Sequence, residues 1–350
     1  MAKLVQIVFL IIMAVTVVEA YDVLLGVYYG LNGDNLPPPW KVVQLCEKYN
    51  IRRIRLDGPN VDVLNAFRGT GIDVSFSIPN DKLTDMATNK TRVEEWFNTY
   101  IKPFIGDFKI NYIIVGDKAI PGLDNCILPV MMSLQDLLNA HYLGQVKITT
   151  LVGYNGALAS KDPPSSGAFH ETVSENLRGI LQFLVEEGSP LMVSVFPYRK
   201  YKFHGGVSLN YAIFNETKPV VRDGELNYYN LFDAMVDAFY AAIDKEAVGD
   251  VTIAVGETGW PTCGDNDTST KAIAAEYNKK FVTHICSGKG TPRKPNVFLE
   301  GFIQSIFNED ENPDGESQCY GMFDVDMNPS YSLFSNATTL NPLVRKGKKN

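Results

Sequence analysis

The chain has 350 residues, of which 45% are hydrophobic and 21% charged, so it carries enough apolar side chains for a sizeable core. Its formal net charge of −8 and isoelectric point near 5.2 argue against nucleic acids and anionic membranes as partners, because both require a basic face. A neutral ligand is compatible with this charge. No Pro/Ser-rich linker, charge block or low-complexity segment divides the chain, which favours one domain.

The first segment of the chain is predicted to be a secretory signal peptide over residues 1–20. Lys3 precedes an apolar run from Leu4 to Val18, and the following residues, up to Ala20, offer small side chains for cleavage. No other segment is long and apolar enough to predict a membrane span. We therefore expect an exported protein, found in the apoplast or the vacuole, without a membrane anchor.

Glycosylation sequons agree with export. Four Asn-X-Thr sequons occur, at Asn89, Asn215, Asn266 and Asn336. The last one opens the tail of residues 336–350, which ends in RKGKKN and lacks the hydrophobic stretch of a GPI anchor signal. This tail is either a solvated basic end or a removable extension.

The five cysteines do not form a metal-binding pattern. They show neither CxxC pairs nor Cys/His ligand spacing, so we expect no metal and no cofactor. Their odd number in an exported chain leaves at least one thiol without a disulfide. Disulfides could form among three of them, and the sequence does not choose the pairing: Cys263, Cys286 and Cys319.

Short apolar runs alternate with longer segments of helical spacing between residues 21 and 335. Helical spacing is clear in LFDAMVDAFYAAIDK, residues 231–245. Eight strands alternating with helices predict an α/β fold, a single-domain (β/α)8 TIM barrel with parallel strands inside. A doubly wound open sheet is the alternative, but no GxGxxG follows the first strand. The predicted strands are residues 23–30, 51–56, 72–78, 110–116, 146–152, 191–196, 251–256 and 298–307.

Residues 251–262, VTIAVGETGWPT, are typical of a buried strand that ends in a shaped loop. Glu257 stands at the exit of this strand, the end at which parallel α/β proteins bind ligands. Trp260 could offer a flat apolar face to a sugar ring, while Gly256 and Gly259 allow close approach of the backbone. The alternative interpretation is structural, with Glu257 as a cap and Trp260 in the core.

The residues that follow the other predicted strands are rich in amide, carboxylate and aromatic groups, and include no histidine. Examples are Tyr29, Asn80, Tyr198 and Glu309. Planar hydrogen-bonding groups and aromatic faces suit a polyhydroxylated ligand. The sequence therefore predicts an open glycan-binding cleft at this end of the barrel.

Several motifs resemble those of the plant endo-1,3-β-glucanases of glycoside hydrolase family 17, over nearly the whole chain after the signal peptide. They are LGVYYGLNGDNLPPP (25–39), IRRIRLDGPN (51–60), YNLFDAMVDAFYAAIDK (229–245), VGETGWPT (255–262), GTPRKP (290–295), FNEDEN (307–312) and YGMF (320–323). The resemblance implies a (β/α)8 barrel with a long cleft for β-1,3-glucan, and we expect a monomer. It also implies a retaining mechanism, with a nucleophilic Glu after strand seven and an acid/base Glu after strand four.

The chain keeps one of these two carboxyl groups. Glu257 matches the nucleophile of the family's SE(S/T)GWP motif, but Lys118 stands where the family pattern VGNE has its acid/base Glu, and Asp117 replaces the Asn before it. A retaining glycosidase needs two carboxyl groups about 5–5.5 Å apart, one of them protonated. Loss of the proton donor lowers the rate by about 10²- to 10⁴-fold.

Other positions depart from the family or agree with it. Asp57 replaces the Tyr of RLYDPN, and Arg199 adds a cation where the family often reads YPYF, whereas Glu300 and Glu309 match family carboxylates. Asp117 could substitute as the acid if a bulge redirected it, but we expect Lys118 to form an ion pair with Glu257 instead. Three hypotheses follow: a weakly active β-1,3-glucanase, a glucan-binding pseudoenzyme, and a structural or storage glycoprotein.

Overall fold

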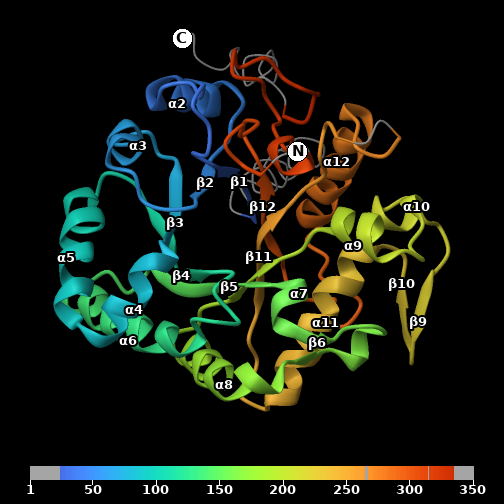
Figure 1. The fold of residues 1–350 in the computed structure, drawn as a ribbon, viewed down its shortest axis with the longest axis horizontal. Coiled ribbons are helices and arrows are strands. Elements are labelled where there is room, and N and C mark those ends of the chain that lie inside the picture. The colour runs from blue at the N-terminus through green and yellow to red at the C-terminus, as the bar shows by residue number, and fades with distance from the viewer. Residues whose placement is uncertain (1–23, 265–266, 314, 335–350) are drawn as a thin grey trace, which may run out of the picture.

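A closed barrel of eight parallel strands forms the centre of the molecule (Figure 1). The computed structural model describes residues 24–334, apart from residues 265, 266 and 314. The predicted signal peptide, the C-terminal tail and the sequons at Asn266 and Asn336 lie outside the described residues. Around the barrel the strands follow the order β1, β12, β11, β8, β5, β4, β3, β2, which closes on itself.

Each barrel strand coincides with one of the eight predicted runs, so the predicted (β/α)8 fold is confirmed and the open sheet is wrong. The strand bounds are β1 Leu25–Tyr29, β2 Arg53–Leu56, β3 Asp73–Ile78, β4 Ile110–Asp117, β5 Lys147–Gly153, β8 Leu191–Ser194, β11 Ile253–Thr258 and β12 Glu300–Gln304. Most residues of these strands are buried, because helices cover the outside and side chains fill the inside.

A ring of helices surrounds the barrel (Figure 1). They are α2 Pro39–Lys48, α3 Val61–Ala66, α4 Asn80–Thr88, α5 Lys90–Tyr100, α6 Asp124–Ala140, α8 Glu171–Glu186, α11 Leu231–Glu246 and α12 Lys271–Cys286. Helix α11 begins after Asn230, whose side chain accepts a hydrogen bond from the backbone of Asp233. It is buried on nearly all sides, and Gly167 approaches it so closely that a Cβ there would lie 2.0 Å from the carbonyl oxygen of Ala238.

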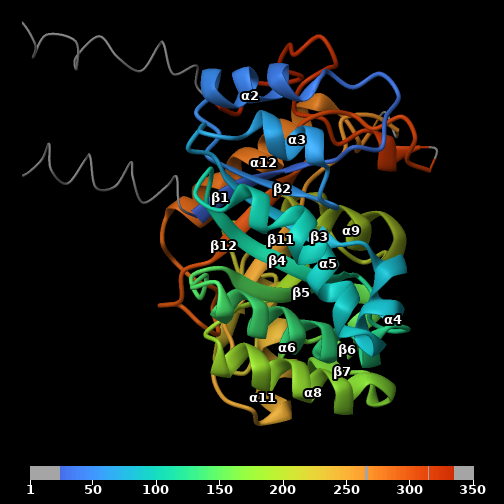
Figure 2. The ribbon, with the colours of Figure 1, turned by 90° about the vertical axis from the view of Figure 1, so that its left-hand side faces the viewer.

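Short elements that the sequence did not predict are inserted between the barrel strands. They are α7 Tyr154–Ala157, β6 Leu158–Ser160, β7 Ala168–Phe169, α9 Pro197–His204, α10 Leu209–Ala212, β9 Val221–Asp223, β10 Leu226–Tyr228 and the 3₁₀ turns Lys102–Phe104, Pro164–Ser166 and Glu316–Gln318. Most of them follow the ends of β5 and β8. Figure 2 shows α4, α9 and the β6–β7 hairpin on one side of the barrel, at the right of this view. Elements this short show too few repeats for a hydrophobic period to be recognised.

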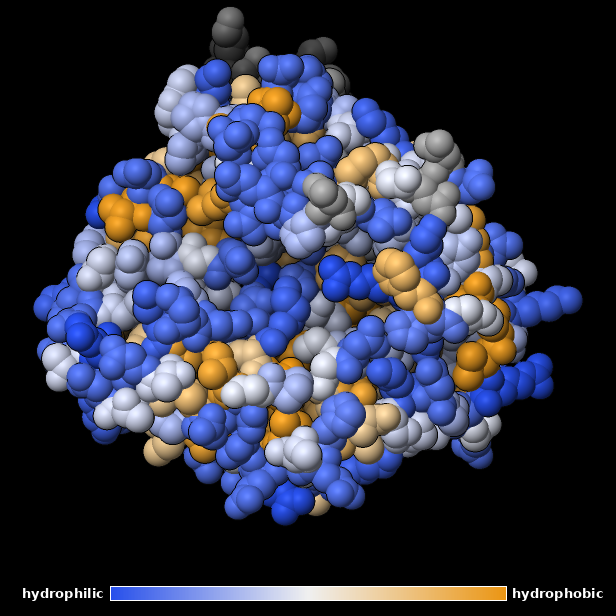
Figure 3. Space-filling model, in the orientation of Figure 1, coloured by the Kyte–Doolittle hydropathy of each residue, from blue (hydrophilic) through white to orange (hydrophobic). Residues whose placement is uncertain are grey.

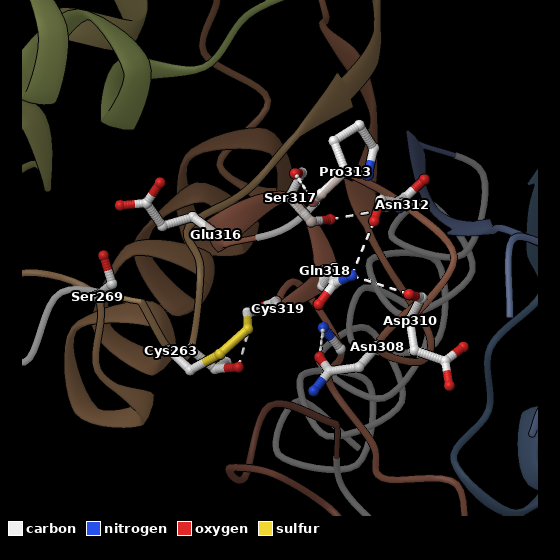
Figure 4. Close-up of a disulfide and its surroundings, with 12 residues drawn as sticks. Cys263, Ser269, Asn308, Asp310, Asn312, Pro313, Glu316, Ser317, Gln318 and Cys319 are labelled. Carbon is white, nitrogen blue, oxygen red and sulfur yellow. Dashed lines mark hydrogen bonds between the residues drawn. A yellow bond between two sulfur atoms is a disulfide. The ribbon is translucent and has the colours of Figure 1, made fainter.

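A disulfide joins the loops that leave two neighbouring strands. Cys263, after β11, is bonded to Cys319, after β12, with 5.5 Å between their Cα atoms (Figure 4). The backbone N–H of Thr262 also donates to the carbonyl of Cys319, at 2.7 Å. The thiols of Cys46 and Cys126 are buried away from this bond. Within the described residues, no helix combines the length and apolar character needed to cross a bilayer.

Polar side chains occupy both ends of the barrel interior. At the end where the strands begin, Arg53 forms an ion pair of 2.7 Å with Glu300, and the hydroxyl of Tyr112 donates to Glu300 at 2.9 Å. A separate apolar cluster follows along the strands: Tyr112, Ile114, Leu151, Met192, Ala254 and Phe302. Arg55 lies two residues beyond Arg53 on β2 and therefore reaches the other end, where the strands finish.

Candidate functional site

Glu257 lies inside the barrel mouth, next to the last residue of β11. Its side chain is buried, and its Oε1 accepts hydrogen bonds of 2.7 Å from both Lys118 Nζ and Ser194 Oγ. The pairing register of β11 shifts between Val255 and Glu257. Gly256 makes this irregularity feasible, since a Cβ there would lie 2.6 Å from the side chains of Leu151 and Met192. The close approach predicted for Gly256 is confirmed.

The end of β4 places two consecutive side chains at the same site. The register of β4 against β5 shifts between Ile114 and Asp117, and both Gly116 and Lys118 have positive φ angles, of 86° and 52°. This bulge allows Asp117 and Lys118 to reach one centre, although neighbouring strand residues ordinarily point to opposite faces. Lys118 Nζ lies 2.7 Å from Glu257 Oε1 and 3.1 Å from Asp117 Oδ1. The predicted Lys118–Glu257 ion pair is therefore confirmed.

The two carboxylates of the site lie close together, with cations between them. Asp117 Oδ1 and Glu257 Oε1 lie 3.1 Å and 2.7 Å from the same Lys118 Nζ, so these two oxygens are separated by no more than the sum of those distances. Asp117 also pairs closely with Arg55 and accepts a hydrogen bond of 3.2 Å from Ser77. The bulge thus brings Asp117 near Glu257, but Lys118 contacts one oxygen of each carboxylate.

Neighbouring charges shift the pKa values of both Glu257 and Lys118. Burial alone would raise the pKa of Glu257, but the charges of Lys118 and Arg55 and the hydrogen bonds from Lys118 and Ser194 lower it to about 2. Burial would lower the pKa of Lys118, yet Glu257 and Asp117 raise it above its ordinary value. At neutral pH the pair is therefore a carboxylate and an ammonium ion.

Arg55 contacts the two carboxylates of the site, Asp117 and Glu257, from inside the barrel. Its side chain is fully buried, and its guanidinium lies 3.7 Å from Glu257 Oε2, 3.4 Å from Ser77 Oγ and 5.3 Å from the centre of the Tyr28 ring. Asn80 fixes the backbone of Asp117, donating to its carbonyl at 2.8 Å and accepting from its N–H at 3.0 Å.

Arg55, Ser77 and Ser194 belong to the site but were not among the residues predicted from the sequence. One usable signal was the pair Arg53 and Arg55 within a strand, since residues two apart share a face. A charged residue at alternate positions of a buried strand indicates a polar interior.

Three aromatic residues predicted to bind the ligand are buried in the core. Trp260 has no exposed surface, and its indole N–H donates to the carbonyl of Thr268 at 2.7 Å. Its ring packs against Tyr198, Tyr201 and Tyr277, so the prediction of a sugar platform is wrong and the core interpretation is correct.

Tyr198 and Tyr29 are each 1% exposed, and their predicted binding roles are also wrong. The hydroxyl of Tyr198 bonds to Ser269 and Glu316, which Figure 4 shows beside the disulfide. Tyr29 packs edge-on against Phe307.

Glu300 and Glu309 are the two other carboxylates predicted to bind substrate, and they lie in different parts of the barrel. Glu300 is the first residue of β12 and pairs with Arg53 at the opposite end of the barrel, so the prediction that it binds substrate is wrong. Glu309 lies near the cleft but is only 3% exposed, and it accepts a hydrogen bond of 3.0 Å from the backbone of Asn32. Burial raises the pKa of Glu309. Its contact with Asn32 ties the loops after β1 and β12 together.

A cleft extends on both sides of Lys118. One cavity, of about 410 Å³, is lined by residues that follow β2, β3 and β4, including Asp57, Asn80 and Asp117. A second, of about 260 Å³, lies toward β5 and β8 and includes Tyr154, Phe196 and Arg199 among its walls. Lys118 lines both cavities. Hydrophilic surface fills the middle of the face drawn in Figure 3, as expected for a polar cleft.

The two described sequons differ in access. The side chain of Asn89 is exposed at the start of α5, whereas the Nδ2 of Asn215 donates to Glu276 at 2.8 Å in a half-buried site. No group of three or more His, Cys, Asp or Glu side chains within the described residues is arranged to hold a metal ion.

A (β/α)8 barrel with a buried carboxylate at the exit of β11, inside a polar cleft, defines the class of barrel glycosidases. The profile of "Glycosyl hydrolases family 17" matches residues 25–334, and the chain belongs to this family. It is 41% identical over 314 residues to a "Probable glucan endo-1,3-beta-glucosidase BG4" of Arabidopsis thaliana, which covers 89% of this chain and 90% of that protein.

Other relatives and solved structures are also similar to this chain over most of its length. A "Putative glucan endo-1,3-beta-glucosidase GVI" of Hordeum vulgare is 36% identical, covering 88% of this chain and 96% of that protein. The structure of CJP38, described as a β-1,3-glucanase and allergen of Cryptomeria japonica pollen, superposes with a TM-score of 0.84 at 37% identity, covering 89% and 99% of the two chains. One of two plant β-glucan endohydrolases gives a TM-score of 0.83 at 34% identity, covering 89% and 100%.

Proposed function

We propose that this chain binds β-1,3-glucan in its cleft and hydrolyses it only weakly. The observation that carries the proposal is the 2.7 Å ion pair between Lys118 and Glu257, formed at the position where the family's proton donor stands. Export through residues 1–20 and a monomeric state are parts of the same proposal. The relatives named as glucan endo-1,3-beta-glucosidases support the choice of polysaccharide.

The ion pair opposes hydrolysis in two ways. First, an ammonium ion whose pKa is raised by Glu257 and Asp117 does not deliver a proton to a departing sugar oxygen at neutral pH. Second, the attacking oxygen of Glu257 is already engaged by Lys118 and Ser194, so the nucleophile must give up a charged contact before it can form a bond. A carboxylate held in place without a proton donor is compatible with binding and poor turnover.

A second candidate function is a β-1,3-glucanase that uses Asp117 as its acid. The bulge in β4 and the shared contact with Lys118 favour this candidate, because they bring Asp117 close to Glu257. Opposing it, both oxygens of Asp117 already contact cations, Oδ2 contacting Arg55 and Oδ1 contacting Lys118.

The decisive experiment measures laminarin binding and release of reducing sugar on the same purified samples. The unaltered chain is expected to bind laminarin and to release little sugar. Lys118→Glu places a carboxyl group beside Glu257, where like charge raises its pKa and makes it a proton donor. This variant is expected to gain activity of about 10²- to 10⁴-fold.

Two further variants separate the alternatives. Glu257→Gln is expected to keep laminarin binding and to abolish any remaining hydrolysis. If the unaltered chain turned over laminarin rapidly and Asp117→Asn removed that activity, Asp117 would be the acid and our proposal would be wrong. If no variant bound laminarin, the structural or storage interpretation would stand.

A further inference from the structure

The cavity between Lys118 and α9 is unusually basic for an acidic chain. Three cationic side chains line its volume of about 260 Å³, namely Lys118, Arg199 and Lys200, and no Asp or Glu does. The whole chain carries a formal net charge of −8, so a cavity lined by three cations and no carboxylate runs against the average. We propose that this cavity binds a sugar that carries a carboxylate, that is, a uronosyl residue of an acidic glycan.

Arg199 is the cation best placed to recognise an added carboxylate. Lys118 is neutralised by Glu257 and Asp117, and Lys200 pairs with Asp162. Within the described residues, no carboxylate lies within ion-pair distance of Arg199. Its guanidinium lies 4.9 Å from the centre of the Phe196 ring, on the wall of the cavity. A guanidinium offers two parallel N–H donors, which match the two oxygens of a carboxylate.

The remaining walls suit a sugar ring better than a bare anion. Tyr154 and Phe196 contribute aromatic surface, while Asn155 and Ser194 contribute an amide and a hydroxyl. Aromatic faces accommodate the C–H face of a pyranose, and the polar groups can bond to its hydroxyls. The Nζ of Lys200 lies 3.3 Å from the hydroxyl of Tyr154, so the cationic and aromatic parts of the wall are contiguous.

The cavity on the other side of Lys118 has the opposite character. Asp57 and Asp117 line it, and the only cation it shares is Lys118. A carboxylated sugar is repelled there and attracted toward Arg199, so an acidic glycan is expected to bind in one orientation. This inference rests on the proposed function in one respect, since it takes the cleft to be a glycan-binding site.

A matched pair of ligands tests the inference by calorimetry at low ionic strength. One ligand is laminaritriose, and the other is the same trisaccharide with its C6 hydroxymethyl groups oxidised to carboxylates. The oxidised ligand is expected to bind at least about tenfold more tightly, corresponding to one charge-assisted hydrogen-bonded pair. Added salt is expected to reduce this advantage.

Arg199→Gln should remove most of that advantage, measured as the ratio of the two affinities on the same variant, because Gln keeps a polar side chain but has no charge. Arg222→Gln, on the exposed β9–β10 hairpin, is the matched control and should change neither affinity. Unfolding curves of both variants verify that each is folded.

Several outcomes would overturn the inference. These are equal or weaker binding of the oxidised ligand, an unchanged preference in Arg199→Gln, or displacement of the oxidised ligand by an equal concentration of sulfate, which would indicate a simple anion site. Binding of laminaritriose alone would refute the acidic-sugar site and leave the proposed function standing. Binding of the oxidised ligand alone would refute the β-1,3-glucan proposal and support the acidic-sugar site.

Discussion

Lys118 Nζ and Glu257 Oε1 are 2.7 Å apart at the mouth of the barrel, so a cation directly contacts the carboxylate at the exit of β11. Glu257 is buried, whereas the side chain of Lys118 is 45% exposed. The pair therefore combines a desolvated carboxylate with a cation that still reaches the cleft. The ion pair therefore affects both the proton chemistry of the site and the stability of the fold.

Replacing Lys118 by Glu should change the pH dependence of laminarin hydrolysis. Two adjacent carboxyl groups titrate as a pair, so the rate profile is expected to be bell-shaped, with one limb from the ionised nucleophile and one from the protonated donor. Lys118→Gln is the control, because it removes the ammonium without supplying a carboxyl group. A gain of activity in Lys118→Gln equal to that in Lys118→Glu would show that relief of the ion pair, rather than the new acid, is responsible.

Acid should destabilise the protein through Glu257. Its folded pKa of about 2 lies below the ordinary value of 4.5, so the folded state holds the ionised form more strongly than the unfolded chain does. The corresponding stability is fully present above pH 4.5 and is lost as the pH falls from 4.5 to 2. Its full size is of the order of 3 kcal/mol.

Urea unfolding across that pH range tests this prediction. Glu257→Gln should remove a large part of the pH dependence, whereas Glu94→Gln, at an exposed position on α5, should leave it unchanged. An identical acid sensitivity in Glu257→Gln would show that other carboxylates cause the loss.

Trp260→Ala should act on stability rather than on glycan recognition. The fully buried indole packs against three tyrosines, and its removal leaves a large cavity, so the free energy of unfolding should fall by about 3–5 kcal/mol. Trp260→Phe should lower the free energy of unfolding by a smaller amount. Laminarin affinity measured on the folded fraction should change little in Trp260→Phe, and a selective loss of affinity without loss of stability would restore the sugar-platform role.

Removing the disulfide should lower the stability of the protein. Cys263 and Cys319 are 56 residues apart in the sequence, and a bond closing a loop of this size contributes about 2–4 kcal/mol, chiefly by restricting the unfolded chain. Cys263→Ser with Cys319→Ser should lower the melting temperature measured by calorimetry. Cys126→Ser, at a buried thiol outside this bond, is the control. Equal melting temperatures for the double variant and the unaltered chain would contradict the prediction.

The sequence by itself determined the barrel fold and showed that Lys118 stands where the family has its acid/base Glu. Eight apolar runs of strand length alternating with helical periods favour a (β/α)8 fold, and the absence of GxGxxG after the first strand weakens the doubly wound alternative. The motif at the end of the seventh strand identified Glu257, and the resemblance to the family's VGNE pattern identified the replacement at Lys118. They also predicted the ion pair, since opposite charges at strand exits around one barrel mouth attract one another.

Only the tertiary structure decided which side chains face the cleft. Trp260 and Tyr198 follow strand exits, as ligand-binding residues do, but they pack inward against Tyr277 and Ser269 because loops from distant parts of the chain cover them. Asp117 and Lys118 are adjacent in sequence yet reach one centre, because a bulge cancels the alternation of the strand. Burial and bulges depend on long-range packing, which local patterns do not encode.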